Sequence, residues 1–468
     1  MSMKILIAAS EALPFAATGG LADVIGSLPH ALYKNGVDVR VVIPMYSSID
    51  EKFRKDIKFI KAITVKLSWR NQYCGIFESE YKGVKYYFID NEYYFRRQSM
   101  YGEMDDGERY AFFSKAILAL MPNIGFFPDV LHTNDWQTAL AVIYLKRYCS
   151  VDYSHTKSLH TLHNIEYQGE FGFDMLQDVF DLSPSDRSIV DYKGRINLTK
   201  GALICCDKFS TVSPTYAEEI KTPTYSHGLD HILNMHSDKI TGILNGIDTE
   251  IYKPETFDVT DLSGKATVKT DLQKEIGLPV NEDIPMIGLI SRLVTHKGMD
   301  LITHVIEEFI QGDVQFVLLG TGDAKFENFF RYLESKFPEK VRCIISYNVE
   351  LSKRIYAGSD IFLMPSKSEP CGLAQMISSQ YGTIPLVRET GGLYDSIKDY
   401  NPATGKGNGF TFRDFNAHDM LYKLKFAVDM YQNDKETWNK LIKQVMTVDF
   451  SWDVSAEKYI KLYEELIN

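Results

Sequence analysis

The sequence predicts an α/β protein made of two doubly wound domains that face each other across a cleft. Short β-branched runs at residues 5–7, 39–43 and 84–89 lack clean polar alternation. Strands that are buried on both faces have this pattern, which favours parallel sheets covered by helices. Longer stretches with helical spacing follow them, at 108–121 and 136–148. This βα rhythm implies right-handed crossovers and an open sheet.

The rhythm restarts in the second half of the chain. Five further strand candidates alternate there with helical stretches, at 286–290, 314–319, 341–346, 361–364 and 384–387. A turn-rich region around residues 245–254 separates the halves. We therefore predict a first domain at 1–245, a second at 246–448 and a terminal amphipathic helix within 449–468. In such folds a ligand lies at the carboxyl ends of the strands.

Composition excludes several classes of function. The 51 basic and 62 acidic residues give a net charge of −11, which disfavours nucleic acid or an anionic membrane as a partner. The six cysteines form no CxxC pair, so neither a metal site nor a redox motif is indicated. No apolar run approaches the roughly 18 residues of a membrane span. We expect a cytoplasmic protein that uses no metal and no cofactor.

Two glycine pairs stand where a strand passes into a helix. Thr18-Gly19-Gly20 follows the first strand, with Asp23 in the next turn, and Thr390-Gly391-Gly392 follows the strand at 384–387. Backbone N–H groups at such turns can approach an anion at a helix N-terminus. One Gly-Gly turn is usually only a turn. Two of them, one in each domain, could hold a diphosphate from both sides.

Charged residues follow two strands of the second half. Arg292 and Lys297 come after the strand at 286–290 and could neutralise a diphosphate leaving group. Glu369 follows the strand at 361–364, within Glu-Pro-Cys-Gly-Leu. Its carboxylate could accept hydrogen bonds from sugar hydroxyls and stabilise positive charge at an anomeric carbon. Solvated surface residues would be the ordinary interpretation, but the position at the strand ends favours a site.

Several ordered segments together resemble the glycogen and starch synthases. They are the first Gly-Gly loop, the Arg292–Lys297 pair, residues 369–373, Asp135-Trp136, and the His-Asn…Tyr-Gln-Gly segment at 163–169. The resemblance covers nearly the whole chain and is closest to the bacterial ADP-glucose type. It implies two Rossmann-like domains in the GT-B arrangement and a C-terminal helix that crosses back to the first domain. One residue departs from the family pattern, because Ala17 stands where these enzymes usually have a lysine.

The resemblance also implies a set of site residues. The catalytic residues would be Glu369, His163, Arg292, Lys297 and Asp135. The donor would be bound by Thr18, Gly19, Gly20, Asp23, Asn245, Cys371, Gly372, Leu373, Thr390, Gly391 and Gly392. Tyr93 and Tyr94 would stack on the acceptor, although packing within the core explains these two rings equally well.

The implied reaction transfers glucose from ADP-glucose to the non-reducing 4-hydroxyl of an α-1,4-glucan, such as glycogen or maltooligosaccharides, with retention at the anomeric carbon. A retaining hydrolase typically shows two carboxylates, and only one strong candidate is present here, which favours a front-face route. Two alternatives stay open. One is another GT-B transferase with a different donor or a small acceptor. The other is a decayed glucan-binding homologue, for which Ala17 is the only hint.

Overall fold

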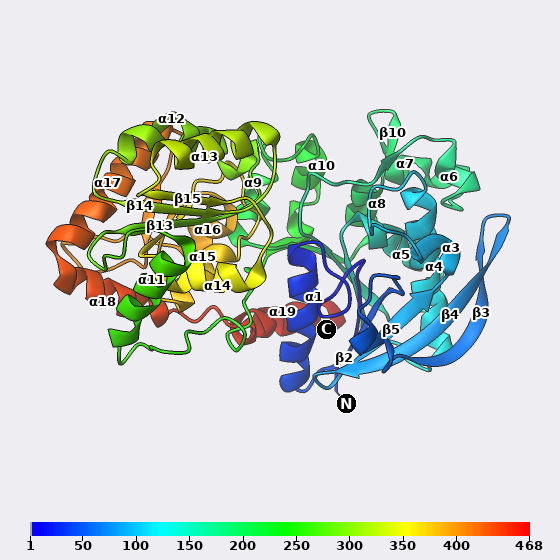
Figure 1. Cartoon of the computed structure of the whole chain (residues 1–468). Helices are drawn as coiled ribbons and strands as arrows, with labels where there is room; N and C mark the ends of the chain where they lie inside the picture. The colour runs from blue at the N-terminus through cyan, green and yellow to red at the C-terminus, as the bar shows by residue number, and fades with distance from the viewer. Residues whose placement is uncertain (1) are drawn as a thin grey trace. The chain divides into compact units, whose positions relative to one another are not determined.

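The computed structural model describes residues 2–468, and the chain divides into two compact units. Unit 1 comprises Met1–Gly246 together with Trp452–Asn468, and unit 2 comprises Ile247–Ser451. Each unit is a parallel sheet covered by helices (Figure 1). The predicted α/β class with two doubly wound domains is therefore confirmed. The chain passes from one unit to the other twice, after Gly246 and after Ser451.

Unit 1 contains a nine-stranded sheet in the order β12-β11-β7-β6-β1-β2-β5-β4-β3. The strands from β12 to β5 run parallel, as predicted, and only β4 and β3 are antiparallel additions. The bounds are β1 Lys4–Ala8, β2 Asp38–Pro44, β3 Lys58–Leu67, β4 Arg70–Tyr81, β5 Val84–Asp90, β6 Val130–Asn134, β7 Lys157–Leu162, β11 Lys208–Thr211 and β12 Ile240–Gly242.

The β3–β4 hairpin is an element that the sequence analysis did not predict. It forms the long light-blue arm of unit 1, at one edge of the sheet (Figure 1). Most residues of β3 are exposed, and Lys58, Lys61 and Lys66 lie on this edge strand. Lysines on an edge strand discourage pairing with another chain.

The helices of unit 1 cover both faces of its sheet. α19 (Trp452–Ile467) lies beside α1 (Gly20–Lys34) and buries Trp452, Tyr459 and Tyr463 in the core of unit 1 (Figure 1). The predicted terminal helix that returns to the first domain is thus confirmed.

The other helices are α2 Glu51–Arg54, α3 Glu92–Phe95, α4 Asp106–Asn123, α5 Trp136–Arg147, α6 Met175–Asp178, α7 Arg187–Val190, α8 Leu198–Cys205, α9 Pro214–Glu219 and α10 Asp230–Met235. A small second sheet has the order β8-β10-β9, with β8 Glu170–Phe171, β9 Asp191–Tyr192 and β10 Arg195–Asn197.

Unit 2 contains a six-stranded parallel sheet in the order β15-β14-β13-β16-β17-β18. Its strands are β13 Met286–Ile290, β14 Gln315–Leu319, β15 Val341–Ile344, β16 Ile361–Met364, β17 Ile384–Arg388 and β18 Phe410–Phe412, so the five predicted strands are confirmed and one short strand is added. Its helices are α11 Ser263–Ile276, α12 Met299–Phe309, α13 Ala324–Lys336, α14 Val349–Gly358, α15 Ala374–Gln380, α16 Gly391–Ser396, α17 Ala417–Asn433 and α18 Lys435–Met446.

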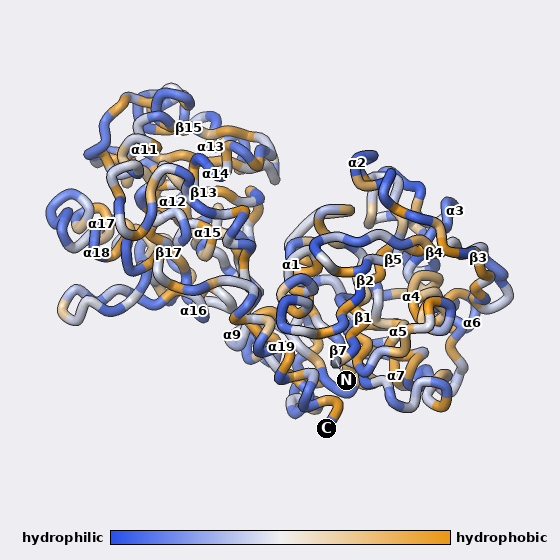
Figure 2. Tube along the Cα trace, turned by 90° about the horizontal axis from the view of Figure 1, so that it is seen from below, coloured by the Kyte–Doolittle hydropathy of each residue, from blue (hydrophilic) through white to orange (hydrophobic). Residues whose placement is uncertain are grey.

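Apolar residues concentrate in the interior of each unit, and hydrophilic ones on its loops and outer helices (Figure 2). In unit 1 the main core is formed by the central strands with α1, α4, α5 and α19. In unit 2 it is formed by the sheet with α12, α13, α17 and α18. Within residues 2–468, no helix combines the length and apolar character that crossing a membrane requires.

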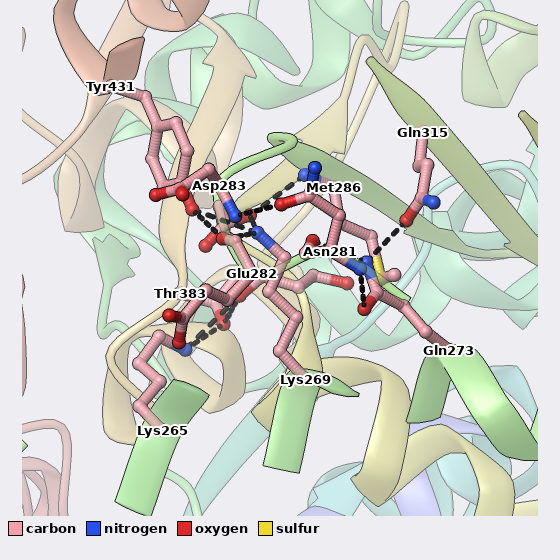
Figure 3. Close-up of polar contacts among 12 residues, drawn as sticks. Lys265, Lys269, Gln273, Asn281, Glu282, Asp283, Met286, Gln315, Thr383 and Tyr431 are labelled. Carbon is pink, nitrogen blue, oxygen red and sulfur yellow. Dashed lines mark hydrogen bonds and ion pairs between the residues drawn. The ribbon is translucent and has the colours of Figure 1, made fainter. Parts of the chain in front are cut away.

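Two buried lysines of α11, Lys265 and Lys269, form hydrogen bonds near the amino ends of the unit 2 strands (Figure 3). Lys265 donates to the carbonyls of Ala357, Ser359 and Tyr381 and to the Thr383 hydroxyl. Ala357 and Ser359 lie at the end of α14, and Tyr381 lies at the end of α15, so one ammonium group satisfies carbonyls at two helix C-termini. Burial lowers the pKa of Lys265 to about 7.

The second of these lysines is paired with a carboxylate. Lys269 donates to Asp360 at 2.6 Å and to the Tyr431 hydroxyl at 2.8 Å (Figure 3). Asp360 directly precedes β16, and the loop after β16 carries Glu369. The network therefore holds the far end of the strand that leads to this glutamate.

Candidate active site

Glu369 lies in the loop that follows β16, at the carboxyl edge of the unit 2 sheet. Its side chain is only 6% exposed, and its Oε2 accepts from Lys297 Nζ at 2.6 Å and from Ser366 Oγ at 2.9 Å. Lys297 comes from the turn after β13, so two neighbouring strands bring this pair together. The predicted carboxylate and one predicted cation are in direct contact.

Arg292, the second predicted cation, lies in the same turn as Lys297 but is exposed. Its guanidinium makes no ion pair within the part of the chain that the structure describes. An Arg–carboxylate or Arg–phosphate contact can be bidentate and charge-assisted, so this group is available to an anion.

The Gly391-Gly392 turn holds the Glu369 loop in place. Gly391 has φ +43°, and a Cβ on either glycine would collide with a carbonyl oxygen, that of Glu369 or of Cys371. The Gly392 N–H donates to the Glu369 carbonyl at 3.1 Å. The Gly392 N–H is thus used inside the protein, and the donor contact expected for Gly392 stays a prediction. Only glycine allows the close approach that this packing needs.

Arg388 supports the same loop from β17. Its Nη1 donates to the Lys367 carbonyl at 2.8 Å and to the Ser366 carbonyl at 3.4 Å. The sequence analysis did not single out Arg388. Nothing in the local sequence indicates that it crosses to the neighbouring strand's loop.

In unit 1, Asp135 and His163 follow the adjacent parallel strands β6 and β7. Asp135 has φ +56°, a strained conformation for a residue with a side chain, and its Oδ1 accepts the His163 N–H at 2.7 Å. Burial raises the pKa of Asp135 to about 7, although the N–H groups of His163 and Asn164 lower it. The carboxylate therefore ties the end of β6 to the turn after β7.

The orientation of the His163 ring is fixed by Asn134. The Asn134 amide nitrogen donates to the Ala8 carbonyl, so its Oδ1 is the atom that lies 3.0 Å from His163 Nε2. An amide oxygen only accepts, so Nε2 must carry the proton. Burial lowers the pKa of His163 to about 3, so the ring is neutral at pH 7 and Nδ1 is an acceptor.

The first Gly-Gly loop is organised by Glu11, a residue that the sequence analysis missed. The buried Glu11 carboxylate accepts from the Thr18 N–H, the Thr18 hydroxyl and the Tyr101 hydroxyl. Burial raises the pKa of Glu11, and burial together with the Glu11 charge raises the pKa of Asp23 to about 6. Nothing lies within 4 Å of a Cβ placed on Gly19 or Gly20, so this loop is open on that side.

A hollow of about 560 Å³ lies in unit 1, against Trp136 at the start of α5. Its aromatic wall consists of Trp136, Tyr167 and Phe171, and four carboxylates also line it, those of Glu103, Asp106, Glu166 and Glu170. Gly169, with φ +67°, brings the backbone against the Trp136 ring. Tyr167 is 56% exposed, so its ring is open to a ligand.

Two family models match the chain. The starch synthase catalytic domain matches residues 4–235, and glycosyl transferases group 1 matches residues 272–445. A glycogen synthase of Bacillus cereus (strain Q1) is 47% identical over 476 aligned residues, which cover 99% of this chain and 100% of that one. A glycogen synthase of Clostridium novyi (strain NT) is 46% identical, with 100% of each chain covered.

The chain belongs to the glycogen and starch synthase family.

Solved structures agree with this assignment. The catalytic domain of starch synthase IV from Arabidopsis thaliana, bound to ADP and acarbose, has a TM-score of 0.92 at 35% identity, and the match covers 100% of both chains. A sucrose-phosphate synthase from Thermosynechococcus elongatus has a TM-score of 0.62 at 15% identity, which shows the fold alone. The protein is a GT-B glycosyltransferase of this synthase family and acts on a nucleotide sugar and a glucan.

One of the two predicted acceptor tyrosines does not fit that role. Tyr94 has no exposed surface, and its hydroxyl donates to Glu108 at 2.6 Å. A buried ring cannot stack on a glucan, so this prediction is wrong and Tyr94 is a packing residue. Tyr93 is 65% exposed and stays a prediction.

The remaining predicted donor residues lie in both units. Cys371 is buried beneath the Glu369 loop, Gly372 has φ +69°, and Leu373 caps the start of α15. Thr390 precedes the Gly391 turn. Asn245 is 6% exposed, and its Oδ1 has no hydrogen-bond partner within residues 2–468. Among those same residues, no group of three or more His, Cys, Asp or Glu side chains is placed to hold a metal ion.

Proposed function

We propose that this protein is a glycogen synthase that transfers glucose from ADP-glucose to the non-reducing 4-hydroxyl of an α-1,4-glucan with retention. The observation that carries the proposal is the Lys297–Glu369 pair, with Arg292 in the turn that also carries Lys297. A donor needs a cationic site for its diphosphate and a carboxylate for its sugar. These three residues follow two neighbouring strands of unit 2.

Arg292 and Lys297 bind the diphosphate in this proposal. When the donor binds, the Lys297 ammonium group donates to a phosphate oxygen as well as to Glu369. The exposed Arg292 supplies a second cation. Fixed positive charge acts most strongly where negative charge develops, and here that is on the departing ADP.

Glu369 stabilises the sugar at the reacting carbon. The bond between the anomeric carbon and the diphosphate oxygen breaks as the bond to the acceptor O4 forms on the same face. The acceptor proton passes to the departing diphosphate, so no protein base is needed. Ser366 and Lys297 hold the Glu369 carboxylate in its orientation during this step.

His163 orients the donor glucose. Because Asn134 fixes the proton on Nε2, Nδ1 can accept a hydrogen bond from a sugar hydroxyl. Asn245 contributes similarly, since its buried Oδ1 has no hydrogen-bond partner among residues 2–468. A buried acceptor without a hydrogen bond costs about 1–3 kcal/mol, which a donor hydroxyl would recover.

Tyr347 is a further candidate for the donor site. It follows β15 at the carboxyl edge of the unit 2 sheet and is 90% exposed. An exposed aromatic ring can stack on a nucleotide base, and such stacking is worth about 1–3 kcal/mol. We propose that Tyr347 contacts the adenine of ADP-glucose.

The glucan acceptor occupies the unit 1 hollow. The ring of Tyr167 and the indole of Trp136 offer apolar faces to sugar rings, and the carboxylates offer acceptors to hydroxyls. Trp136 follows Asp135 at the carboxyl end of β6, so the hollow adjoins the carboxyl edge of the unit 1 sheet, which supports this role.

A turnover assay tests the proposal. ADP-glucose and UDP-glucose are supplied side by side with glycogen, and glucose incorporation is measured. We expect a higher kcat/KM with ADP-glucose, and α-amylase should release the incorporated glucose because the new bonds are α-1,4. Comparable or higher efficiency with UDP-glucose would overturn the donor assignment, and no incorporation from either donor would overturn the activity.

A further inference from the structure

The hollow beside Trp136 is lined by four carboxylates, of which two lie near an arginine. Asp106 pairs with Arg109 at 2.5 Å, and Arg109 is fully buried. Glu103 lies 3.9 Å from Arg97 and accepts from the Ser99 hydroxyl at 3.2 Å. Arg97 pairs more closely with Asp105, at 2.7 Å, so its charge is shared between two acids, and Asp106 is the one lining carboxylate of this pair with a close ion pair.

Glu166 and Glu170 have no such partners. Both side chains are exposed, and neither forms an ion pair within residues 2–468. Glu166 and Glu170 flank Tyr167, Gln168 and Gly169 in the sequence, and both carboxylates line the same hollow as the exposed Tyr167 ring.

The lining of the hollow contains no lysine or arginine, and the neighbouring cation Arg195 lies on β10, whose Asn197 pairs with Glu170. His227 is the lining residue that can become cationic. Lys193 lies outside the lining, with its Nζ near Gly228 and 5.2 Å from the Tyr192 ring centroid. At pH 7 the open side of the hollow therefore carries a net negative charge. Walls of one charge sign repel a ligand of the same sign.

We propose that Glu166 and Glu170 make the hollow select uncharged glucan chains and reject chains whose glucose units carry phosphate or carboxylate groups. This inference rests on the proposed function, because it takes the hollow as the acceptor site. Neutral glucan hydroxyls donate hydrogen bonds to the two carboxylates. A phosphate at C6 of a bound glucose has no hydrogen to donate when fully ionised, and it meets two like charges.

The selection is electrostatic, so it depends on the ionic strength. At a hydrated surface, two like unit charges several ångströms apart repel each other. Each such pair weakens the binding of a charged ligand by a few-fold to about tenfold. Salt screens charges separated by more than the Debye length, which is about 10 Å at 0.1 M. Discrimination against anionic glucans should therefore be strongest in dilute buffer.

The experiment compares two acceptors and three proteins. The acceptors are maltoheptaose and maltoheptaose that carries one phosphate at C6, both with ADP-glucose as donor. The proteins are the unmodified enzyme, the double variant Glu166→Gln/Glu170→Gln, and a control, Glu457→Gln/Glu464→Gln, which removes two exposed carboxylates from α19 instead. The readout is the ratio of kcat/KM between the phosphorylated and the neutral acceptor.

We expect the double variant to raise this ratio at least tenfold at low salt, and by much less at 0.5 M NaCl. Its KM for neutral maltoheptaose should rise modestly, because an amide is a weaker acceptor than a carboxylate. The control should leave the ratio unchanged. A variant that uses maltoheptaose but shows an unchanged ratio, or a control that raises the ratio equally, overturns the inference and leaves the proposed function intact. An unmodified enzyme that transfers no glucose to maltoheptaose overturns the proposed function itself.

Discussion

At the scale of single residues, Glu369 is held by two neighbours from the same sheet edge. Lys297 and Ser366 both contact its Oε2, at 2.6 and 2.9 Å, whereas Oε1 accepts no hydrogen bond from any of residues 2–468. A carboxylate that is anchored through one oxygen can present the second to a substrate. The anchoring residues therefore matter as much as the glutamate.

The first prediction is that Glu369→Gln folds normally but loses most of its rate. Loss of one preorganised electrostatic group typically lowers kcat about 100- to 1000-fold. Steady-state kinetics with ADP-glucose and glycogen measure this, with Glu350→Gln, an exposed residue of α14, as the matched control. A variant within a few-fold of the unmodified enzyme would remove Glu369 from the mechanism.

The second prediction concerns the pH dependence of stability through Asp135. Its pKa is about 7 in the folded protein, against an ordinary value near 3.8 in the unfolded chain. The folded state thus holds a proton that the unfolded state has released between about pH 4 and 7. The contribution of Asp135 to stability is full below that window and is lost as the pH rises through it.

The difference in the free energy of unfolding between Asp135→Asn and the unmodified protein should therefore shift in favour of the variant as the pH rises from 5 to 8. The shift is at most about 1.4 kcal/mol per pH unit. Thermal melts of both proteins across this range measure the difference. The difference should level off above about pH 8, where both folded and unfolded Asp135 are ionised. A difference that stays constant with pH would show that Asp135 titrates normally.

The third prediction concerns Ala17, the departure from the family pattern. Ala17 is exposed and precedes Thr18, whose N–H is bound by Glu11. Ala17→Lys should lower KM for ADP-glucose about tenfold if the added charge recovers ~1.4 kcal/mol at the donor. Ala17→Met provides the uncharged control of similar length. An unchanged or raised KM would show that the added lysine pairs with Glu11 or Asp23, or that the site has already compensated.

At the scale of elements, the two Gly-Gly loops look alike in sequence but differ in their surroundings. The loop before α1 is open around Gly19, whereas the loop before α16 is packed against the carbonyls of Glu369 and Cys371. Their common motif correctly predicts a strand-to-helix turn. It does not distinguish a loop that is free to meet a ligand from one that supports a catalytic residue, because that depends on which other loop lies beside it.

The fourth prediction separates these two loops. Gly392→Ala should lower the melting temperature and kcat together, because the added methyl collides with the Cys371 carbonyl and displaces the Glu369 loop. Gly19→Ala should leave the melting temperature nearly unchanged, since the site is open and its φ of −164° suits any residue. Differential scanning fluorimetry and turnover measure both. Equal melting temperatures for the two variants would contradict the packing role.

The sequence predicts the parallel strands well because burial on both faces leaves a strong apolar signal, as in β1 and β13. The sequence analysis did not predict the β3–β4 hairpin, although Ile63, Val65 and Leu67 alternate with polar residues as in a half-buried strand. Glu11 and Arg388 were also missed, because each acts on a loop that its local sequence does not reveal. Tyr94 was misjudged for the same reason, as only the packing of α4 against it decides its burial.

At the scale of the whole molecule, unit 1 is built from two separate stretches of chain. Its core includes six residues of α19 that are encoded after all of unit 2, namely Trp452, Ala456, Tyr459, Leu462, Tyr463 and Leu466. Unit 2 is a single continuous stretch. The two units therefore differ in how completely they can form when separated.

The fifth prediction is that residues 247–451 fold alone, whereas residues 1–246 do not form a stable domain. Burial of a large apolar side chain contributes about 1.5–3 kcal/mol, so the loss of α19 removes on the order of 10 kcal/mol from unit 1. Circular dichroism and thermal melts of the two fragments measure this. A synthetic peptide of residues 452–468 added to fragment 1–246 should restore cooperative melting. A cooperative transition in fragment 1–246 alone, near that of the full chain, would contradict the prediction.

The hydrogen bond between Tyr463 and His132, at 2.8 Å, carries a consequence for synthesis on the ribosome. His132 lies in β6, three residues before Asp135. Its hydrogen-bond partner Tyr463 is translated more than 300 residues later. During that interval the nascent first unit exposes the groove that α19 will fill, while the second unit can emerge and fold. Chaperones that recognise apolar surface should therefore engage the nascent chain throughout translation of residues 247–451, and release it only after α19 has left the exit tunnel.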